Sequence, residues 1–288
     1  MAYRLTAAFD TLRLRARMLA RVREFFTERG LLEVETPALS PAAPTDPAIE
    51  SIAAAVASLG RTHYLHTSPE FAMKRLLAAG SGDIWQLCRV WRDGEIGRWH
   101  QPEFTMLEWY RVGWDEERLM DEVEALLRHA AGADVAAWPA ARVPYARAFE
   151  DATGVDPHRV LAEAAPRGAA SARLASRLAD AGIDVPRGLR GSALLDLAFG
   201  TLVQGALPRD ALTFVHDYPL AQAALARSKG GTPPVAARFE LFGGGLELAN
   251  GFAELTDPAE QRRRFEADQA EREAAGLPIR PIDEPFLA

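Results

Sequence analysis

The first hydrophobic pattern in the chain has the spacing of three and four residues that is typical of an amphipathic helix. Its apolar stripe comprises Leu14, Met18, Val22, Phe25 and Phe26. Gly30 is placed to end this helix, because glycine readily adopts the left-handed conformation found at helix termini. We predict a helix of about five turns, followed by a short strand over residues 31–37 and a proline-rich loop.

Two segments in the middle of the chain have the composition of β-strands. Residues 84–92 and 104–111 are rich in β-branched, aromatic and apolar side chains, and a glycine-containing loop joins them. We predict two antiparallel strands. In the second strand, alternation places four side chains on one face: Phe104, Met106, Glu108 and Tyr110. A carboxylate among apolar residues is costly unless a cation meets it, so Glu108 is either an edge residue in water or part of a pocket for positive charge.

A second strand pair is predicted over residues 238–242 and 246–252, because three glycines separate two apolar runs there. Three acidic residues lie in this region at equal intervals of seven: Glu240, Glu247 and Glu254. They are compatible with one solvated face of a strand pair. Clustered carboxylates also suit Mg²⁺ and ammonium groups, since oxygen donors match hard cations.

A helix start is predicted at residues 68–70, where Ser68 can cap the helix and Pro69 can occupy its first position. An acidic residue such as Glu70 in the first turn commonly complements the helix dipole, so alone it assigns no function. The remaining patterns predict a strand over residues 212–218 and helices over residues 115–131, 192–204 and from Asp257 onward. The alanine- and glycine-rich residues 162–190 are predicted to form a mobile connection.

Composition restricts the compartment and the class of partner. The 288 residues, of which 48% are hydrophobic, suffice for one large domain. With a formal net charge of −7, the chain lacks the excess of basic residues that is typical of a dedicated RNA-binding protein. The single cysteine, Cys88, excludes internal disulfides and fits a reducing compartment. No apolar run approaches the roughly 20 residues of a membrane span. We expect a cytoplasmic, single-domain protein without membrane contact.

Together, these segments resemble class II lysyl-tRNA synthetases. Trp-Arg-Asp-Gly-Glu at 91–95 and the run from His to Tyr at 100–110 are similar to motif 2 of this family. Residues 67–70 and 247–255 are similar to its pocket segments, and residues 30–39 resemble motif 1, through which the family dimerises. The resemblance covers most of the chain. It implies a homodimer and an α+β fold of the class II catalytic type, with a mostly antiparallel sheet flanked by helices.

The resemblance assigns the chemistry of this family to named residues. The family couples an amino acid carboxylate to ATP, which gives an aminoacyl-adenylate and pyrophosphate. Arg92, as the catalytic residue, bridges the substrate carboxylate and the α-phosphate, because a guanidinium can hold two anions together. Arg98 and His100 meet the outer phosphates, and Phe104 stacks on adenine. Glu240 and Glu247 match the Mg²⁺ positions, and the remaining implied ATP contacts are Asp93, Gly94, Glu95, Gln101 and Leu248.

The same resemblance implies a pocket for a lysine-type amino acid. Glu70, next to Ser68, faces the amino group near the substrate carboxylate. The side-chain ammonium is surrounded by Glu108, Tyr110 and Glu254, and Asn250 completes the polar lining. Two carboxylates and a phenol satisfy the three donors of an ammonium, whereas a neutral side chain would leave them unpaired.

The acceptor follows from a narrower resemblance. Lysyl-tRNA synthetases carry an anticodon-binding domain before motif 1, and here the first helix begins near Thr11 and leaves no room for it. Residues 97–111 and the Ala-Asn-Gly-Phe run at 249–252 are similar to free-standing relatives that ligate lysine or (R)-β-lysine to a lysine of elongation factor P. This implies elongation factor P as the acceptor in place of tRNA. Two alternatives stay open, a tRNA-charging synthetase core and a non-catalytic paralogue.

Two features depart from the family pattern. Gly94 stands where many synthetases have Glu, so the adenine contact there passes to Glu95. Motif 3, a glycine-rich strand before an arginine-bearing helix, is absent from the sequence. Residues 283–288 have the pattern of a helix that has only begun. We therefore predict that a C-terminal segment with motif 3 is missing.

Overall fold

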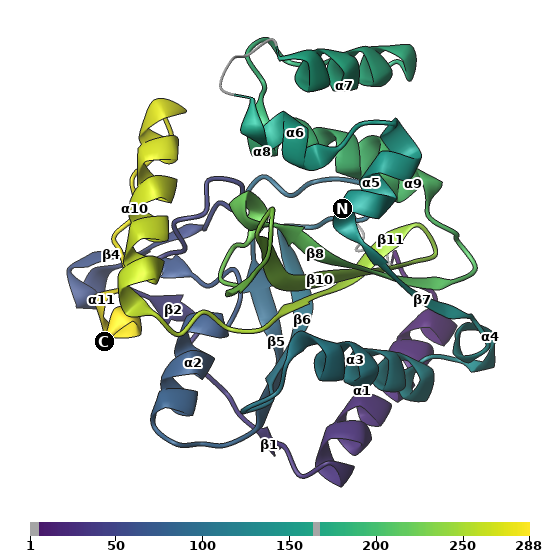
Figure 1. Ribbon diagram of the computed structural model, residues 1–288. Helices are drawn as coiled ribbons and strands as arrows, with labels where there is room; N and C mark the ends of the chain where they lie inside the picture. The colour runs from purple at the N-terminus through teal and green to yellow at the C-terminus, as the bar shows by residue number, and fades with distance from the viewer. Residues whose placement is uncertain (1–5, 164–167) are drawn as a thin grey trace. The chain divides into compact units, whose positions relative to one another are not determined.

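A computed structural model describes residues 6–163 and 168–288, and the chain divides into two compact units. The first unit comprises Met1–Val22 and Trp114–Leu255, and the second comprises Arg23–Gly113 and Thr256–Ala288. The predicted α+β class is confirmed, because helices accompany mainly antiparallel sheets in both units (Figure 1). That residues 1–288 form a single domain stays a prediction.

The second unit holds two three-stranded sheets. In one, β5 (Ile84–Trp91) lies between β1 (Leu32–Glu33), which is parallel to it, and β6 (Glu103–Tyr110), which is antiparallel. The other is antiparallel and contains β2 (Leu39–Ser40), β4 (Arg61–Leu65) and β3 (Ala53–Val56), with the short helix η1 (Ala57–Leu59). Its helices are α2 (Glu70–Ala78), α10 (Pro258–Ala274) and α11 (Glu284–Leu287). The strands predicted at 84–92 and 104–111 are thus confirmed, and the strand predicted at 31–37 shortens to two residues.

Alternation along β6 separates the core of this sheet from its functional face. Trp85 of β5 and Trp109 of β6 pack on Phe26, with ring centroids 5.1 and 5.3 Å away. The opposite face of β6 carries Glu108, as the sequence predicts. Aromatic burial on one face therefore fixes the register that presents the carboxylate on the other.

The predicted N-terminal helix is confirmed as α1 (Phe9–Glu28), and Gly30 follows it with a φ of 73°. Of its apolar stripe, Phe25 and Phe26 are fully buried. Leu14 and Met18 remain 49% and 40% exposed, as do the nearby Phe9 and Leu12 at 63% and 43%. An amphipathic helix whose apolar side is this exposed presents a surface suited to protein contact.

The helix α10 begins at the predicted cap, Asp257, and carries a fully buried arginine. Arg272 donates to the carbonyl oxygens of Pro278 and Asp46, at 2.8 and 3.1 Å, and pairs with the carboxylate of Glu50. The carbonyl of Glu50 accepts the N–H of Asp93 at 2.8 Å. Arg272 therefore connects three separate segments and supports the backbone that immediately follows Arg92.

Replacing Arg272 with methionine is expected to lower the free energy of unfolding by about 2 kcal/mol, because it removes the buried guanidinium and leaves the carbonyls of Pro278 and Asp46 without this donor. Urea denaturation measures the change. Arg263→Met is the matched control on the same helix, since the side chain of Arg263 is 65% exposed and its pair with Glu260 contributes little. Equal unfolding midpoints for the two variants would contradict the structural role of Arg272.

The first unit is built on a five-stranded sheet in the order β11-β10-β8-β7, with β9 beside β10. Its strands are β7 (Ala140–Pro144), β8 (Leu212–Pro219), β9 (Ser228–Gly230), β10 (Val235–Gly243) and β11 (Leu246–Phe252). Its helices are α3 (Glu116–Ala130), α4 (Ala133–Ala136), α5 (Tyr145–Thr153), α6 (Pro157–Ala162), α7 (Ala169–Asp180), α8 (Gly191–Ala198) and α9 (Gln204–Ala206), with the π-helical turn η2 (Phe199–Val203) and the 3₁₀ turn η3 (Leu220–Gln222). The predicted hairpin, the strand near 212 and the helix after Asp115 are all confirmed.

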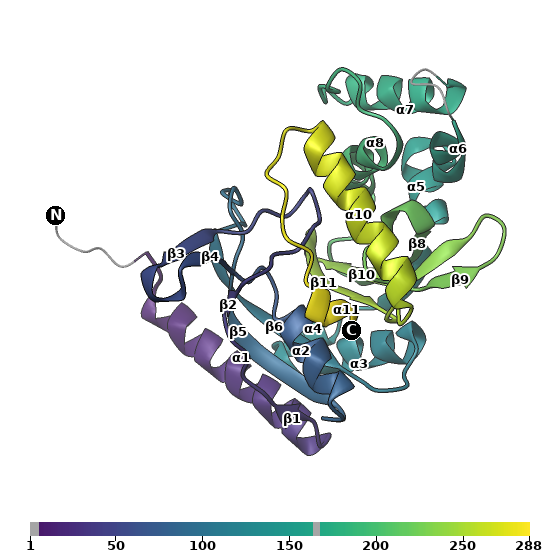
Figure 2. The same cartoon turned by 90° about the vertical axis from the view of Figure 1, so that its left-hand side faces the viewer.

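One expectation in this unit is wrong. Residues 162–190 were expected to form a mobile connection, yet most of them form α7 and its flanks, whereas residues 164–167 lie outside the described part of the chain. Ala170, Leu174 and Leu178 recur every four residues and are buried in the core with Tyr145 and Phe199. Because alanines also occupy exposed positions of α7, such as Ala172 and Ala179, the apolar contrast between its two sides is weak in the sequence. Figures 1 and 2 show α5 to α8 gathered together.

Candidate functional site

The carboxylate of Glu108 is the centre of a polar group in the second unit. The hydroxyl of Tyr110 donates to its Oε1 at 2.8 Å, and the hydroxyl of Ser68 donates to its Oε2 at 2.7 Å. Burial, together with the charge on Glu70, raises the pKa of Glu108 to about 7, although the two hydroxyls and Lys74 act in the opposite direction. Ionised, this carboxylate has further lone pairs that can accept from an ammonium group.

The start of α2 joins this group through one side chain. The Ser68 hydroxyl, which donates to Glu108, also accepts the N–H of Glu70 at 3.0 Å. The helix begins one residue later than predicted, at Glu70, with Pro69 as its N-cap. Glu70 in turn accepts from the ammonium of Lys74 at 2.6 Å. The structure thus brings together four of the predicted pocket residues: Ser68, Glu70, Glu108 and Tyr110. Lys74 was not predicted from the sequence, although residues four apart on a helix, such as Glu70 and Lys74, commonly form ion pairs.

Arg92 lies at the end of β5, where the predicted ATP contacts begin. Its Nε donates to the carbonyl of Thr67 at 3.3 Å, and its guanidinium lies 5.2 Å from the centroid of Phe104. It also forms an ion pair with Glu95 at 3.5 Å. Because Thr67 directly precedes Ser68, Arg92 lies between the amino acid pocket and the aromatic ring expected to stack on adenine.

The loop after Arg92 is largely exposed. Gly94 has a φ of 79°, and its N–H bonds to the side chain of Asp93 at 2.9 Å, so the glycine serves a tight turn there. Arg98 packs on the ring of Trp99, 4.7 Å from its centroid. His100 and Gln101 are exposed in the same loop. The proposed contacts of Arg98, His100 and Gln101 with phosphates stay predictions.

The predicted carboxylates of the first unit lie on β10 and β11. Glu240 accepts from the Tyr218 hydroxyl at 2.6 Å and pairs with Arg238. Burial raises the pKa of Tyr218 well above its usual value and Glu240 adds to this, so the phenol stays protonated and donates. Arg238 also bonds to Asn250 at 3.1 Å. Arg238 and Tyr218 were not predicted from the sequence. Alternation could have indicated Arg238, because it lies two residues before Glu240 on the same face of the strand.

A β-bulge in β11 brings the polar residues onto one face. Leu241 pairs with Ala249, but the next pair is Phe242 with Glu247, so Leu248 has no counterpart on β10. Glu240 pairs with Asn250 directly across the strands. Because paired residues share a face, Glu247 and Asn250 lie on the same side as Glu240. Regular alternation would have placed Glu247 and Asn250 on opposite sides. Glu254 follows the strand and bridges to Ala226.

Magnesium is the metal that the resemblance implies at these carboxylates. Among the residues that the structure describes, no cluster of three or more acidic, histidine or cysteine side chains forms a metal site. Mg²⁺ characteristically uses only one or two protein carboxylates together with substrate phosphates. The shared face of Glu240 and Glu247 fits that requirement. Arg238 and Tyr218 hold Glu240 in place on this face.

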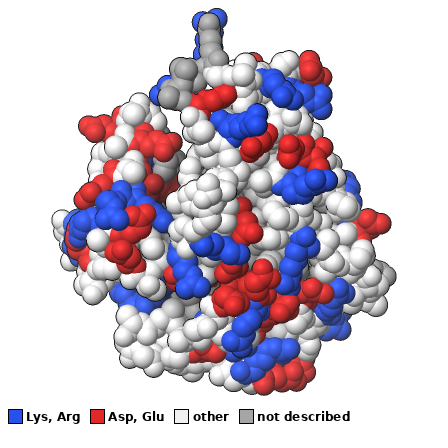
Figure 3. Space-filling view, in the orientation of Figure 1, with Lys and Arg blue, Asp and Glu red and all other residues white. Residues whose placement is uncertain are grey.

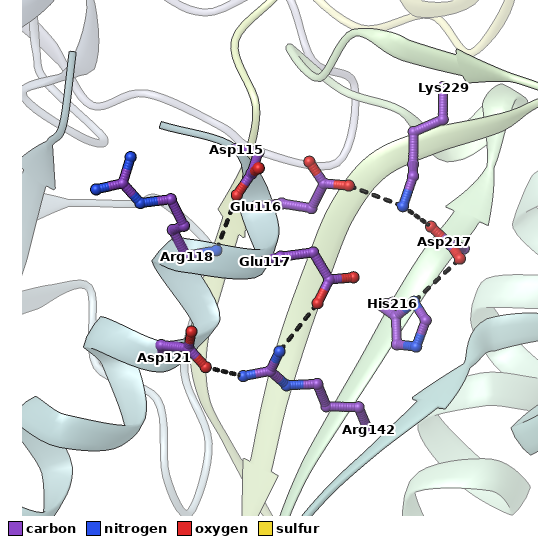
Figure 4. A network of polar contacts seen from close by, with 9 residues as sticks. All are labelled: Asp115, Glu116, Glu117, Arg118, Asp121, Arg142, His216, Asp217 and Lys229. Carbon is purple, nitrogen blue, oxygen red and sulfur yellow. Dashed lines mark hydrogen bonds and ion pairs between the residues drawn. The ribbon is translucent and has the colours of Figure 1, made fainter. Parts of the chain in front are cut away.

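A charged network supports the strand that carries Tyr218 (Figure 4). Lys229 of β9 pairs with the buried Glu116 of α3 at 2.8 Å and with Asp217 of β8 at 2.9 Å. Asp217 has a φ of 56°, in the left-handed region. A hydrogen bond from His216 and contact with Lys229 lower the pKa of Asp217 to about 2, so the network stays charged at neutral pH. It stabilises the backbone conformation directly before Tyr218.

The surface charges shown in Figure 3 are mixed in sign. Lysine and arginine side chains on the visible face alternate with aspartate and glutamate. This face therefore has no continuous basic surface of the kind that binds a nucleic acid backbone. Within the described residues, no helix combines the length and apolar character that crossing a bilayer requires.

Comparison with known proteins agrees with this geometry. Residues 1–278 match the family described as tRNA synthetases class II (D, K and N). A protein of Avibacterium paragallinarum named "Elongation factor P--(R)-beta-lysine ligase" is 43% identical over 287 residues, which cover 98% of this chain and 85% of that protein. Proteins of the same name from Vibrio vulnificus and Klebsiella pneumoniae are each 44% identical over 288 residues, with the same coverage. The similarity therefore extends over nearly the whole chain and is not confined to the motifs.

Proposed function

The chain belongs to the class II tRNA synthetase family of the D, K and N type, and we propose that it is an ATP-dependent ligase acting on elongation factor P. It activates lysine or (R)-β-lysine as an aminoacyl-adenylate and transfers the aminoacyl group to the ε-amino group of a lysine on the factor. The observation that carries this proposal is Glu108, a partly buried carboxylate that accepts from two hydroxyls beside a second carboxylate. The relatives named above are ligases of elongation factor P.

In the first step, a carboxylate oxygen of the amino acid attacks the α-phosphorus of ATP, and the bond to the β-phosphate oxygen breaks to release pyrophosphate. Arg92 holds the two anionic groups together, which lowers their repulsion as they approach. Phe104 stacks on the adenine. Glu240 and Glu247 hold Mg²⁺, which supplies positive charge to the phosphates when bound.

In the second step, the ε-amino nitrogen of the acceptor lysine attacks the carbonyl carbon of the adenylate. An amide bond forms, AMP leaves, and the nitrogen loses a proton. During both steps Glu108 and Tyr110 hold the substrate ammonium, while Ser68 keeps the Glu108 carboxylate oriented. Selectivity for lysine follows, because a neutral side chain would leave Glu108 without its cation.

The proposal includes a homodimer formed through α1. Phe9, Leu12, Leu14 and Met18 expose apolar surface along one helix, and exposed apolar patches of this kind mark contact surfaces. The family resemblance of residues 30–39 to motif 1 supports the same partner, a second copy of the chain. Cytoplasmic localisation accompanies the proposal, because the single Cys88 is free and elongation factor P acts in translation.

The test is ATP–pyrophosphate exchange, measured with lysine, with (R)-β-lysine and without amino acid. The assay is run on the 288-residue chain. Exchange that depends on either amino acid, followed by transfer of labelled amino acid to elongation factor P, supports the proposal. Transfer to tRNA instead identifies a synthetase core, and the absence of amino acid-dependent exchange identifies a non-catalytic paralogue.

A further inference from the structure

We propose that Lys74 is a positioning residue of the amino acid pocket, a resident cation that holds one oxygen of Glu70 and keeps the neighbouring Glu108 ionised for the substrate ammonium. This inference rests on the proposed function, since it assigns Glu70 and Glu108 to substrate binding. It adds a residue that neither the family resemblance nor the names of the relatives assign.

The geometry of Lys74 differs from that of a surface ion pair. Its Nζ lies 2.6 Å from Oε1 of Glu70, and the two side chains are only 14% and 20% exposed. The ammonium also lies 5.7 Å from the ring centroid of Phe286. That ring stacks on Phe71 of α2 at 4.3 Å, which places α11 against α2 (Figure 2). Lys74 is therefore enclosed by a carboxylate and an aromatic ring, and its position is fixed.

The ionisable groups around Glu108 explain how Lys74 lowers the pKa of this carboxyl group. Glu70 and Lys74 face Glu108 from α2, Cys88 faces it from β5, and Tyr110 lies beside it on β6. Burial raises the pKa of the Cys88 thiol to about 11, so Cys88 is neutral at pH 7. Lys74 is thus the cation that offsets the repulsion between Glu70 and Glu108. Without it, the pKa of Glu108 rises further above its usual value, and less of the carboxylate is ionised at neutral pH.

Lys74 also restricts the conformation of the Glu70 side chain. The ammonium contacts Oε1 of Glu70, whereas the backbone N–H of the same residue bonds to Ser68. The first contact restricts the Glu70 side chain and the second fixes its backbone. The proposed function assigns the second carboxylate oxygen to the amino group near the substrate carboxylate. Loss of Lys74 is therefore expected to weaken amino acid binding more than ATP binding.

The first test is a ¹³C NMR titration of the glutamate carboxyl groups without substrate, with Glu108→Gln used to assign the Glu108 signal. Lys74→Gln is expected to raise the pKa of Glu108 by at least about half a unit, whereas Lys74→Arg, which keeps the charge, leaves it near the wild-type value. Arg147→Gln is the matched control, because Arg147 and Asp151 form an equally spaced pair at 2.8 Å that is 69% and 57% exposed. An unchanged pKa of Glu108 in Lys74→Gln overturns the inference.

The second test is kinetic. In Lys74→Gln the KM for the amino acid is expected to rise about tenfold at pH 7 and less at pH 9, where Glu108 ionises again, while the KM for ATP stays within about twofold. A wild-type KM for the amino acid at pH 7 overturns the inference. Wild-type protein without amino acid-dependent exchange instead refutes the proposed function, and the titration still decides whether Lys74 controls the ionisation of Glu108.

Discussion

Replacing Arg92 with alanine is expected to lower kcat/KM for ATP–pyrophosphate exchange by about a thousandfold. The guanidinium donates to the carbonyl of Thr67 at 3.3 Å and lies 5.2 Å from the ring centroid of Phe104. The proposed function assigns it to contact both the amino acid carboxylate and the α-phosphate. These anions repel each other most strongly as the new bond forms. Removing the cation therefore costs more in the transition state than in substrate binding.

Arg89, on the strand that precedes Arg92, provides the control for this prediction. Arg89→Ala removes an arginine of β5 whose side chain is 58% exposed and whose pair with Glu103 is 3.7 Å long, and exchange by this variant is expected to match wild type. Arg92→Lys keeps the charge without the planar fork and is expected to lose about tenfold to a hundredfold. Circular dichroism establishes that each variant is folded. Arg92→Ala with wild-type exchange would refute the assigned role.

The elements that local pattern determines were predictable from the sequence. The period of α1, the alternation that places Glu108 and Tyr110 together, and the cap that places Ser68 before Glu70 all depend on residues close in sequence. Side chains two or four residues apart have fixed relative directions in strands and helices. Local pattern therefore relates Ser68 to Glu70 and Glu108 to Tyr110, whereas the contact between Ser68 and Glu108 spans 40 residues of sequence and was expected only from the family resemblance.

Features that depend on distant segments could not be predicted. The bulge at Leu248 is visible only when the register of β10 against β11 is known. The buried Arg272 pairs with the partly exposed Glu50 across 222 residues of sequence. The helix α7 was missed for a different reason, since alanines weaken the contrast between its buried and exposed positions. Neither pairing between distant segments nor a weakly amphipathic helix can be predicted from the hydrophobic periodicity of this sequence.

The same local arrangement recurs at three of the candidate ligand-binding carboxylates, two in the second unit and one in the first. Glu70 is paired with Lys74, Glu95 with Arg92, and Glu240 with Arg238. A partly buried carboxylate raises the free energy of the folded state unless a cation lies beside it, and these basic side chains reduce that cost. Glu108 differs, because hydroxyls contact both of its oxygens and its own pKa is raised. It is therefore the carboxylate whose ionisation responds most to pH and to the substrate ammonium.

Glu108→Gln is expected to lower kcat/KM for the amino acid by about a thousandfold or more, because it keeps the shape of the side chain and removes the charge that meets the ammonium. In wild type the KM for the amino acid is expected to rise as the pH falls below about 7, the pKa of Glu108, since protonation removes the same charge. The substrate ammonium stays charged over this range. Exchange assays between pH 5.5 and 8.5 measure both effects, and a KM independent of pH would contradict them.

The same substitution is expected to have the opposite effect on stability. The pKa of Glu108 is raised from its usual 4.5 to about 7 on folding, so the folded state binds the proton more tightly than the unfolded chain. Ionisation therefore destabilises the wild type as the pH rises from about 5 to 7, whereas the glutamine of the variant has no proton to lose. We expect the stability of Glu108→Gln relative to wild type to increase by about 2 kcal/mol between pH 5 and pH 8. Urea denaturation at the two pH values measures this difference, and a constant difference would show that Glu108 is ionised at both. If the variant gains stability and loses exchange, the charge of Glu108 contributes to substrate binding and lowers the free energy of unfolding.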